Sequence, residues 1–236
     1  MAAARNSFSV FPLGDSALLA EFGISLDLEV NAKLQGLAES VRAKSLPWIV
    51  DIVPALGSLA LHFDPACVPA GLDPVAAAED LLRDCLRGGL RAPRARSASL
   101  EVPVCYDSEF GPDLAEVAEK VKLPVGEVVR RHAAPGHRVL MMGFAPGQPY
   151  IGGLDAALAV PRRATPRTRV PAGSVAIANA QTAVYPFEIS GGWNVIGRTP
   201  LKVFDVRRDP AALFTPGMNV RFVAIARAEY ERRCAQ

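Results

Sequence analysis

The sequence contains few of the residues from which metal and redox sites are built. It has four cysteines and three histidines in 236 residues, and no two cysteines form a C-x-x-C pair. A structural zinc site needs four such ligands at short spacings, so no metal site is predicted. Isolated cysteines pack more often as small apolar residues in a reducing compartment, and we expect that role for all four.

Several catalytic and carrier motifs are also absent. The sequence has no Gly-Lys dipeptide, no G-x-S-x-G run and no Met-Lys pair. These absences exclude a Walker phosphate loop, an α/β-hydrolase nucleophile elbow and a readable biotin-attachment site. The formal net charge of +2 gives no general attraction to nucleic acid or to an anionic membrane.

Long apolar runs are missing as well. None approaches the roughly 20 residues that span a bilayer, and Asp15 and Glu21 interrupt any signal-peptide core near the N-terminus. We therefore expect a cytoplasmic protein that has no membrane-spanning segment.

The first part of the chain alternates strand and helix patterns. Hairpins are expected across Gly14 and across residues 54–57, and helices along residues 30–41 and after Asp73. The fold class predicted for the whole chain is α+β, and residues 1–90 are expected to form a small ferredoxin-like domain.

From Ser99 onward the pattern is mainly that of β-strands, with helices after Asp113 and Pro124. The expected strands include residues 137–142, 174–178, 182–185, 194–196, 201–204 and 220–225. Many short strands separated by turn residues indicate a closed or nearly closed barrel at 99–236. Residues 91–98 have the composition of a linker between the two domains.

Glycine and proline recur every few residues between positions 143 and 205, which predicts shaped loops on a β scaffold. Arg162, Arg163, Arg167 and Arg169 fall within eight positions of this stretch, and Arg198 follows. Guanidinium groups bind carboxylates and phosphates through paired N–H donors, so the cluster predicts an anion site. The alternatives are a solvated basic loop, or arginines that pair with carboxylates of a partner protein.

Neutral polar groups follow the arginines. Gln181, Thr182 and Tyr185 could orient a lactam or a nucleotide base, or could equally belong to a barrel wall. His132 falls on the apolar stripe of its helix, seven positions after Val125, where a histidine is more often a core residue than a general base. Among the three histidines it is still the best catalytic candidate.

Several runs carry a resemblance to a known family. The chain reads GFAPGQPYIGG from Gly143, PRRATPRTRVPAGS from Pro161 and GGWNVIGRTP from Gly191. Together with VFPLGDSA from Val10 and EVPVCY from Glu101, these runs resemble the 5-oxoprolinase B-subunit family, also called allophanate hydrolase subunit 1. Inhibitors of sensor kinases and the carboxyltransferase subdomains C and D of urea carboxylase belong to the same family.

The chain departs from the family pattern at two positions. The family run reads GFxPGFxYLG, and Gln148 replaces its second phenylalanine, while His137 stands where many relatives carry tyrosine. We expect an apolar loop at this run to form a partner interface. Its residues are Phe144, Pro146, Gln148 and Tyr150.

The resemblance implies a cyclophilin-like barrel and the role of the B subunit in an ATP-dependent 5-oxoprolinase, with the A and C subunits as partners. That complex opens 5-oxo-L-proline to L-glutamate with ATP as co-substrate, because an unstrained lactam is a poor electrophile until its oxygen is phosphorylated. The arginines would bind the anion, Gln181 and Tyr185 would orient the substrate, and His132 would act as acid or base. Two other functions stay open within this family: a regulator of a sensor histidine kinase, and a carboxyltransferase half-domain that serves a biotin carboxylase.

Overall fold

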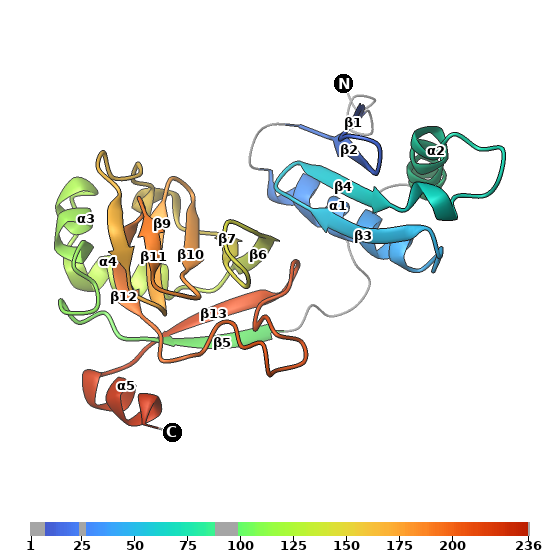
Figure 1. Cartoon of the computed structure of the whole chain (residues 1–236). Coiled ribbons are helices and arrows are strands. Elements are labelled where there is room, and N and C mark those ends of the chain that lie inside the picture. The colour runs from blue at the N-terminus through green and yellow to red at the C-terminus, as the bar shows by residue number, and fades with distance from the viewer. Residues whose placement is uncertain (1–7, 24–26, 88–98, 236) are drawn as a thin grey trace. The chain divides into compact units, whose positions relative to one another are not determined.

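Two separate hydrophobic cores divide the chain into an N-terminal unit, residues 1–96, and a C-terminal unit, residues 97–236. The computed structural model describes residues 8–23, 27–87 and 99–235 (Figure 1). The linker expected at 91–98 lies outside these described residues.

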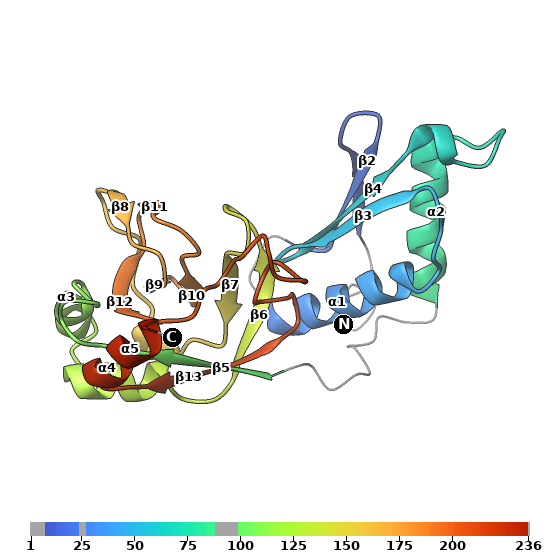
Figure 2. The same ribbon diagram turned by 60° about the horizontal axis from the view of Figure 1, so that its bottom comes forward.

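The N-terminal unit is a four-stranded antiparallel sheet with helices on one face (Figure 2). Its elements are β1 (Ser9–Pro12), β2 (Ala17–Glu21), α1 (Leu28–Arg42), β3 (Ile49–Pro54), β4 (Ser58–Phe63), the 3₁₀ turn η2 (Pro65–Cys67) and α2 (Pro74–Arg87). Each α-helix begins after an aspartate whose carboxylate accepts backbone N–H groups of the first turn, Asp27 for α1 and Asp73 for α2. Such capping satisfies donors that have no partner within the helix.

The alternation of β4 places its apolar residues in the N-terminal core. Leu59, Leu61 and Phe63 are buried and pack with α1 and α2, including Leu82 of α2. The strand order β1-β2-β4-β3 puts β4 between β2 and β3, with α1 connecting those two strands. The order of these elements along the chain is ββαββα, and the N-terminal strand β1 pairs with β2 at the edge of the sheet. It therefore differs from the βαββαβ order of a ferredoxin-like fold, and that part of the expectation is not confirmed.

The C-terminal unit combines a seven-stranded sheet, a two-stranded sheet and helices (Figure 1). The strands are β5 (Ser99–Val104), β6 (His137–Met142), β7 (Pro149–Gly152), β8 (Arg167–Val170), β9 (Ser174–Ala178), β10 (Gln181–Val184), β11 (Ile189–Gly191), β12 (Asn194–Arg198) and β13 (Asn219–Ala224). The helices are α3 (Leu114–Lys120), α4 (Val125–His132), η3 (Ala156–Leu158) and α5 (Arg227–Cys234).

The large sheet curls until its edges meet. Its order is β12-β9-β10-β7-β6-β13-β5, so β12 and β5 are the edge strands. Cys105, directly after β5, forms an antiparallel bridge with Arg198 of β12, and the two backbones exchange hydrogen bonds of 2.9 and 3.0 Å. The expected nearly closed barrel is therefore confirmed.

Strand β9 is buried on both of its faces. Val175 and Ile177 point into the barrel core, whereas Ala176 and Ala178 belong to a second cluster on the outer face. That outer cluster also contains Val170, Ala183, Tyr185, Trp193 and Val195. The β8–β11 pair supplies part of this cover, so this side of the barrel carries an additional apolar layer.

One expected strand is wrong, and two kinds of element were missed. Residues 201–204 are irregular, and within the described ranges their β-pairing is limited to an isolated Phe204–Ala212 bridge, although Val203 is buried in the barrel core. The apolar pattern of this segment reflects the burial of its side chains, and it does not indicate pairing with a neighbouring strand. The short strands β7, β8 and β11 and the charged helix α5 were not expected. In the described part of the chain, no helix has the length and apolar character needed to cross a membrane.

Each unit contains one of the two tryptophans, which makes their stabilities separately measurable. Leu82 is fully buried between α2 and the sheet. We expect Leu82→Ala to lower the free energy of unfolding of the N-terminal unit by about 2–5 kcal/mol, because it leaves a cavity. Denaturation followed by Trp48 fluorescence in a Trp193→Phe background measures this change. In the reciprocal Trp48→Phe background the transition of Trp193 should keep its midpoint, and an equal shift there would contradict two independent cores.

Candidate functional site

A small pocket lies against the outer apolar layer of the barrel. Its volume is about 160 Å³. Its walls are Phe144, Gln148, Tyr150, Arg162, Arg163, Pro166, Tyr185, Gly191, Gly192 and Trp193. The pocket thus brings together residues expected in an anion site and residues expected in a partner interface.

Aromatic rings form much of the pocket wall. Tyr150 meets Trp193 edge to face, with 5.7 Å between ring centroids. Gly191 lies so close to Tyr185 that a Cβ at this position would sit 2.3 Å from the tyrosine hydroxyl. Burial raises the pKa of both Tyr150 and Tyr185, so both phenols stay protonated at neutral pH. The pocket therefore offers flat apolar surfaces with neutral hydroxyl groups.

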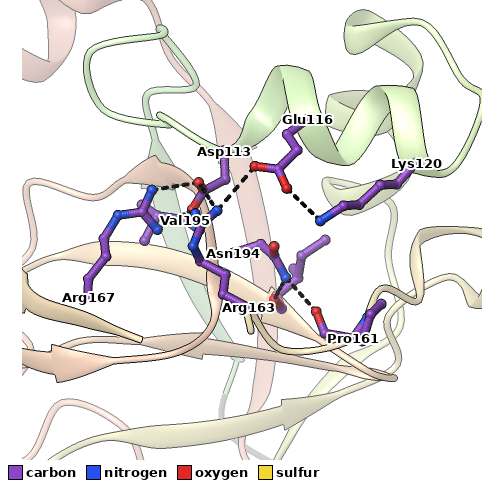
Figure 3. A network of polar contacts seen from close by, with 9 residues as sticks. Asp113, Glu116, Lys120, Pro161, Arg163, Arg167, Asn194 and Val195 are labelled. Atoms are coloured by element: carbon purple, nitrogen blue, oxygen red, sulfur yellow. Dashed lines mark hydrogen bonds and ion pairs between the residues drawn. The ribbon is translucent and has the colours of Figure 1, made fainter. Parts of the chain in front are cut away.

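A buried carboxylate, Asp113, organises the arginines (Figure 3). Asp113 is 2% exposed. Arg167 binds it with both terminal nitrogens, at 2.7 and 2.6 Å, and Nη1 of Arg163 binds it at 2.7 Å. The backbone N–H of Val195 donates to the same carboxylate at 2.7 Å. Four donors compensate the charge, which a buried carboxylate requires.

The Asp113 cluster joins three segments of the C-terminal unit. Asp113 precedes α3, and its backbone N–H donates to the carbonyl of Val195 in β12 at 3.0 Å. The close approach of this segment to β12 depends on Gly111, where a Cβ would lie 2.3 Å from the carbonyl oxygen of Ile196. Arg163 then connects the cluster to the pocket, because its backbone N–H donates to the carbonyl of Gly192 at 2.8 Å.

The structure separates the expected anion-binding arginines into different roles. Arg163 and Arg167 are paired with Asp113, and Arg169 pairs with the exposed carboxylate of Glu188. The Arg198 guanidinium lies over the Phe110 ring at 5.4 Å. Arg162 borders the pocket with its guanidinium 5.8 Å from the Trp193 ring, and it forms no ion pair with any residue in the described ranges. Of these five arginines, Arg162 alone both lines the pocket and has no carboxylate partner among the described residues.

His132 lies inside the barrel core. It is fully buried; its Nδ1 is 2.7 Å from the Tyr106 hydroxyl and its Nε2 is 3.2 Å from the Thr182 hydroxyl. Burial, reinforced by His137, holds the pKa of His132 well below its ordinary value. A neutral ring with both nitrogens engaged and no access to the pocket favours a structural role.

The remaining expected residues are divided between the two faces of β10. Thr182 points inward to His132, whereas Tyr185, just beyond β10, belongs to the outer cluster and lines the pocket. Gln181 does not line the pocket. Alternation along a strand sends neighbouring residues to opposite faces, so Thr182 is separated from Gln181 and Tyr185.

Of the expected interface residues, Phe144, Pro146 and Gln148 lie on the loop between β6 and β7, and Tyr150 lies in β7. Phe144 is 68% exposed and has a positive φ of 71°, which is unusual for a residue with a side chain. Pro146 is exposed and Tyr150 half-buried, while Gln148 is only 2% exposed.

No group of three or more His, Cys, Asp and Glu residues in the described ranges is placed to hold a metal ion.

Asp113 was missed as a site residue because only its place before a helix was visible in the sequence. In the structure its side chain makes no capping bond and instead reaches arginines 50 and 54 positions away. A long-range pairing of this kind leaves no local signal.

From the Asp113 cluster we expect substitutions of two nearby arginines, Arg167 and Arg169, to change the free energy of unfolding by very different amounts. Arg167→Gln should lower the free energy of unfolding of the C-terminal unit by about 3 kcal/mol, because it strips a two-bond partner from a buried carboxylate. Denaturation followed by Trp193 fluorescence in the Trp48→Phe background measures the loss. The matched variant Arg169→Gln breaks only an exposed pair and should leave the midpoint unchanged. Equal shifts in the two variants would mean that Asp113 does not anchor this loop.

The buried histidine predicts how stability depends on pH. Because the pKa of His132 is depressed in the folded state, only the unfolded chain gains this proton as the pH falls below about 6.5. The free energy of unfolding should therefore decline on acidification, by up to about 1.4 kcal/mol per pH unit for this group. His132→Phe should make the decline between pH 6.5 and 5 shallower in Trp193-monitored denaturation. An unchanged slope in this variant would show that His132 is not the group that titrates.

Comparison with known proteins places the chain in a family. A model of the carboxyltransferase domain, subdomain C and D, matches residues 8–214. The 5-oxoprolinase B subunit of Bacillus subtilis is 36% identical over 228 residues, which cover 94% of this chain and 95% of that protein.

Solved structures agree with this match. The crystal structure of TTHA0988 has 36% sequence identity and a TM-score of 0.75; the match covers 89% of this chain but 40% of that longer chain. The urea amidolyase of K. lactis has a TM-score of 0.74 at 19% identity, covering 98% of this chain and 16% of that one, which shows a shared fold alone. From these matches, the chain belongs to the family of the 5-oxoprolinase B subunit and the carboxyltransferase subdomains C and D.

Proposed function

We propose that this chain is the B subunit of an ATP-dependent 5-oxoprolinase, which opens 5-oxo-L-proline to L-glutamate together with the A and C subunits. The observation that carries the proposal is the 36% identity to a 5-oxoprolinase B subunit over 94% of this chain and 95% of the relative. Because the match runs along nearly the whole length of both proteins, it concerns the role of the whole chain rather than that of one shared domain.

The size of the pocket supports a division of labour within the complex. A volume of about 160 Å³ lies below the roughly 300–1,000 Å³ of sites for drug-sized ligands, so it suits a single small ring better than a nucleotide. The sequence also has no Walker phosphate loop. We therefore assign ATP binding to a partner protein of the complex.

Longer proteins with the same fold support the need for partners. The matched region occupies 40% of the TTHA0988 chain and 16% of the K. lactis urea amidolyase chain, so such modules occur joined to other segments. Phe144, at 68% exposure, and Pro146 lie on the loop that borders the pocket. Exposed apolar groups beside a site suit a partner protein that covers them.

The overall reaction explains why ATP is needed. 5-Oxo-L-proline, ATP and two water molecules give L-glutamate, ADP and phosphate. An unstrained lactam resists attack by water, and phosphorylation of its oxygen creates a leaving group. For this chain we propose that the pocket orients the ring and keeps it out of bulk water. The free state of all four cysteines is compatible with the reducing cytoplasm that we propose as its location.

Reconstitution tests this assignment. The purified chain should hydrolyse no ATP, with or without 5-oxo-L-proline, because it has no nucleotide-binding loop of known type. When the A and C subunits are added, 5-oxo-L-proline should stimulate the release of both phosphate and glutamate. The measurement is coupled phosphate and glutamate assays on all single, pairwise and three-way mixtures.

The mixture of the two partners without this chain is the essential control. Full 5-oxo-L-proline-dependent turnover in that mixture, or by this chain alone, would contradict the proposal. The family description also includes carboxyl transfer, and that function is distinguished by its substrate. Turnover that requires bicarbonate and yields no glutamate would identify a component of a carboxyltransferase instead.

A further inference from the structure

The pocket contains a buried polar side chain that has no partner. Gln148 is 2% exposed, lines the pocket, and its Oε1 has no hydrogen-bond partner among the described residues. The Nε of Arg163, on the same wall, is likewise buried and unpaired there. An unpaired buried polar group destabilises a folded chain by roughly 1–3 kcal/mol, so it normally has a use.

The chemistry of a carboxamide defines what would pair with Gln148. Its planar head presents one acceptor and two donors, and a half-turn about the last side-chain bond exchanges the two sides. A ligand that shows an N–H and a C=O on one edge can form two parallel hydrogen bonds with it. A lactam has this edge because its ring forces the amide to be cis. An ordinary peptide bond is trans and shows the two groups on opposite sides, so it cannot pair in this way.

The charge at the pocket indicates a second group on the ligand. Arg163 and Arg167 are paired with the carboxylates of Asp113 and Glu116, and Arg169 is paired with Glu188. Arg162 has no carboxylate partner among the described residues, and its guanidinium lies beside the Trp193 ring in the wall. One unmatched cation beside aromatic surfaces suits a flat ring that bears one carboxylate.

We infer that this pocket binds a small cyclic amide that bears a carboxylate, with Gln148 pairing with the lactam edge and Arg162 with the carboxylate. The ligand class includes 5-oxo-L-proline, so the inference rests on the proposed function and specifies where the substrate binds. It also gives Gln148 a role different from the expected interface contact.

Binding to the full-length chain tests the assignment without catalysis. The Trp48→Phe variant leaves Trp193, a wall residue, as the single tryptophan fluorophore. We expect 5-oxo-L-proline to quench or shift its emission in a saturable way. Two smaller probes separate the contacts: 2-pyrrolidinone has the lactam but no carboxylate, and L-proline has the ring and carboxylate but no lactam. Each should bind about tenfold more weakly or worse, because each leaves one recognition group of the pocket unpaired.

Paired variants assign each contact to its residue. Gln148→Leu should weaken binding of 5-oxo-L-proline and 2-pyrrolidinone about tenfold or more, and leave L-proline unaffected. Arg162→Gln should weaken 5-oxo-L-proline and leave 2-pyrrolidinone unaffected. Arg169→Gln, whose partner Glu188 is outside the pocket wall, is the matched control and should bind like the wild type.

The denaturation midpoint of the Gln148→Leu variant shows whether weaker binding comes from a lost contact or from a destabilised fold. Gln148→Leu removes an unpaired buried amide, so its denaturation midpoint should equal or exceed that of the parent chain. A stable Gln148→Leu variant that binds 5-oxo-L-proline like the parent overturns the inference, as does a parent chain that shows no saturable response at millimolar ligand.

The reconstituted complex distinguishes this inference from the proposed function. If the complex turns over 5-oxo-L-proline and Gln148→Leu leaves kcat/KM unchanged, the pocket assignment fails while the proposed function stands. If Gln148 and Arg162 govern binding but the complex has no turnover, the proposed function fails and the pocket remains a site for this ligand class.

Discussion

A single buried carboxylate determines how the pocket wall is attached to the barrel. Asp113 is held by Arg163, Arg167 and the backbone of Val195, which belong to segments far apart in the sequence. A buried charge that loses its partners is strongly destabilising, so these segments can only move together. Because Arg163 is also bonded through its backbone to Gly192, the position of Trp193 follows from that of Asp113. The arginines thus shape the site by binding a carboxylate of their own chain.

The alternation of small and large side chains couples the site to the core. Strands β9 and β10 place Ala176, Ala178 and Ala183 on the outer face of the barrel. Small residues there leave room for the rings of Tyr185 and Trp193, which pack in the same outer cluster. The inner face of the same strands carries Val175, Ile177 and Val184 and fills the barrel. A substitution on the inner face of these strands therefore changes the packing of the barrel core, whereas one on the outer face changes the layer that borders the pocket.

Local signals predicted local structure well and distant pairings poorly. Turn residues and apolar spacing predicted both hairpins of the N-terminal unit and the starts of α3 and α4, because capping and alternation act over a few residues. The arginine cluster was visible, but its partner Asp113 lies 50 or more positions away and carries no mark of that role. Helix α5 was missed although Glu229 and Arg233 have the i, i+4 spacing of a helical ion pair. The many short strands indicated a nearly closed barrel, but they did not show which side of β10 each residue would face.

The shared direction of β5 and β13 has a consequence for how this barrel can be extended. The two strands run parallel, with Ser99 opposite Asn219 and Val104 opposite Ala224. The chain therefore enters the barrel at one end of this strand pair and leaves it at the other, close to the seam between Cys105 and Arg198. Helix α5, which follows β13, and any polypeptide joined after it therefore continue from the pole opposite the one at which β5 begins. Gene fusion at the C-terminus could thus add a neighbour without competing for the space at the point of entry.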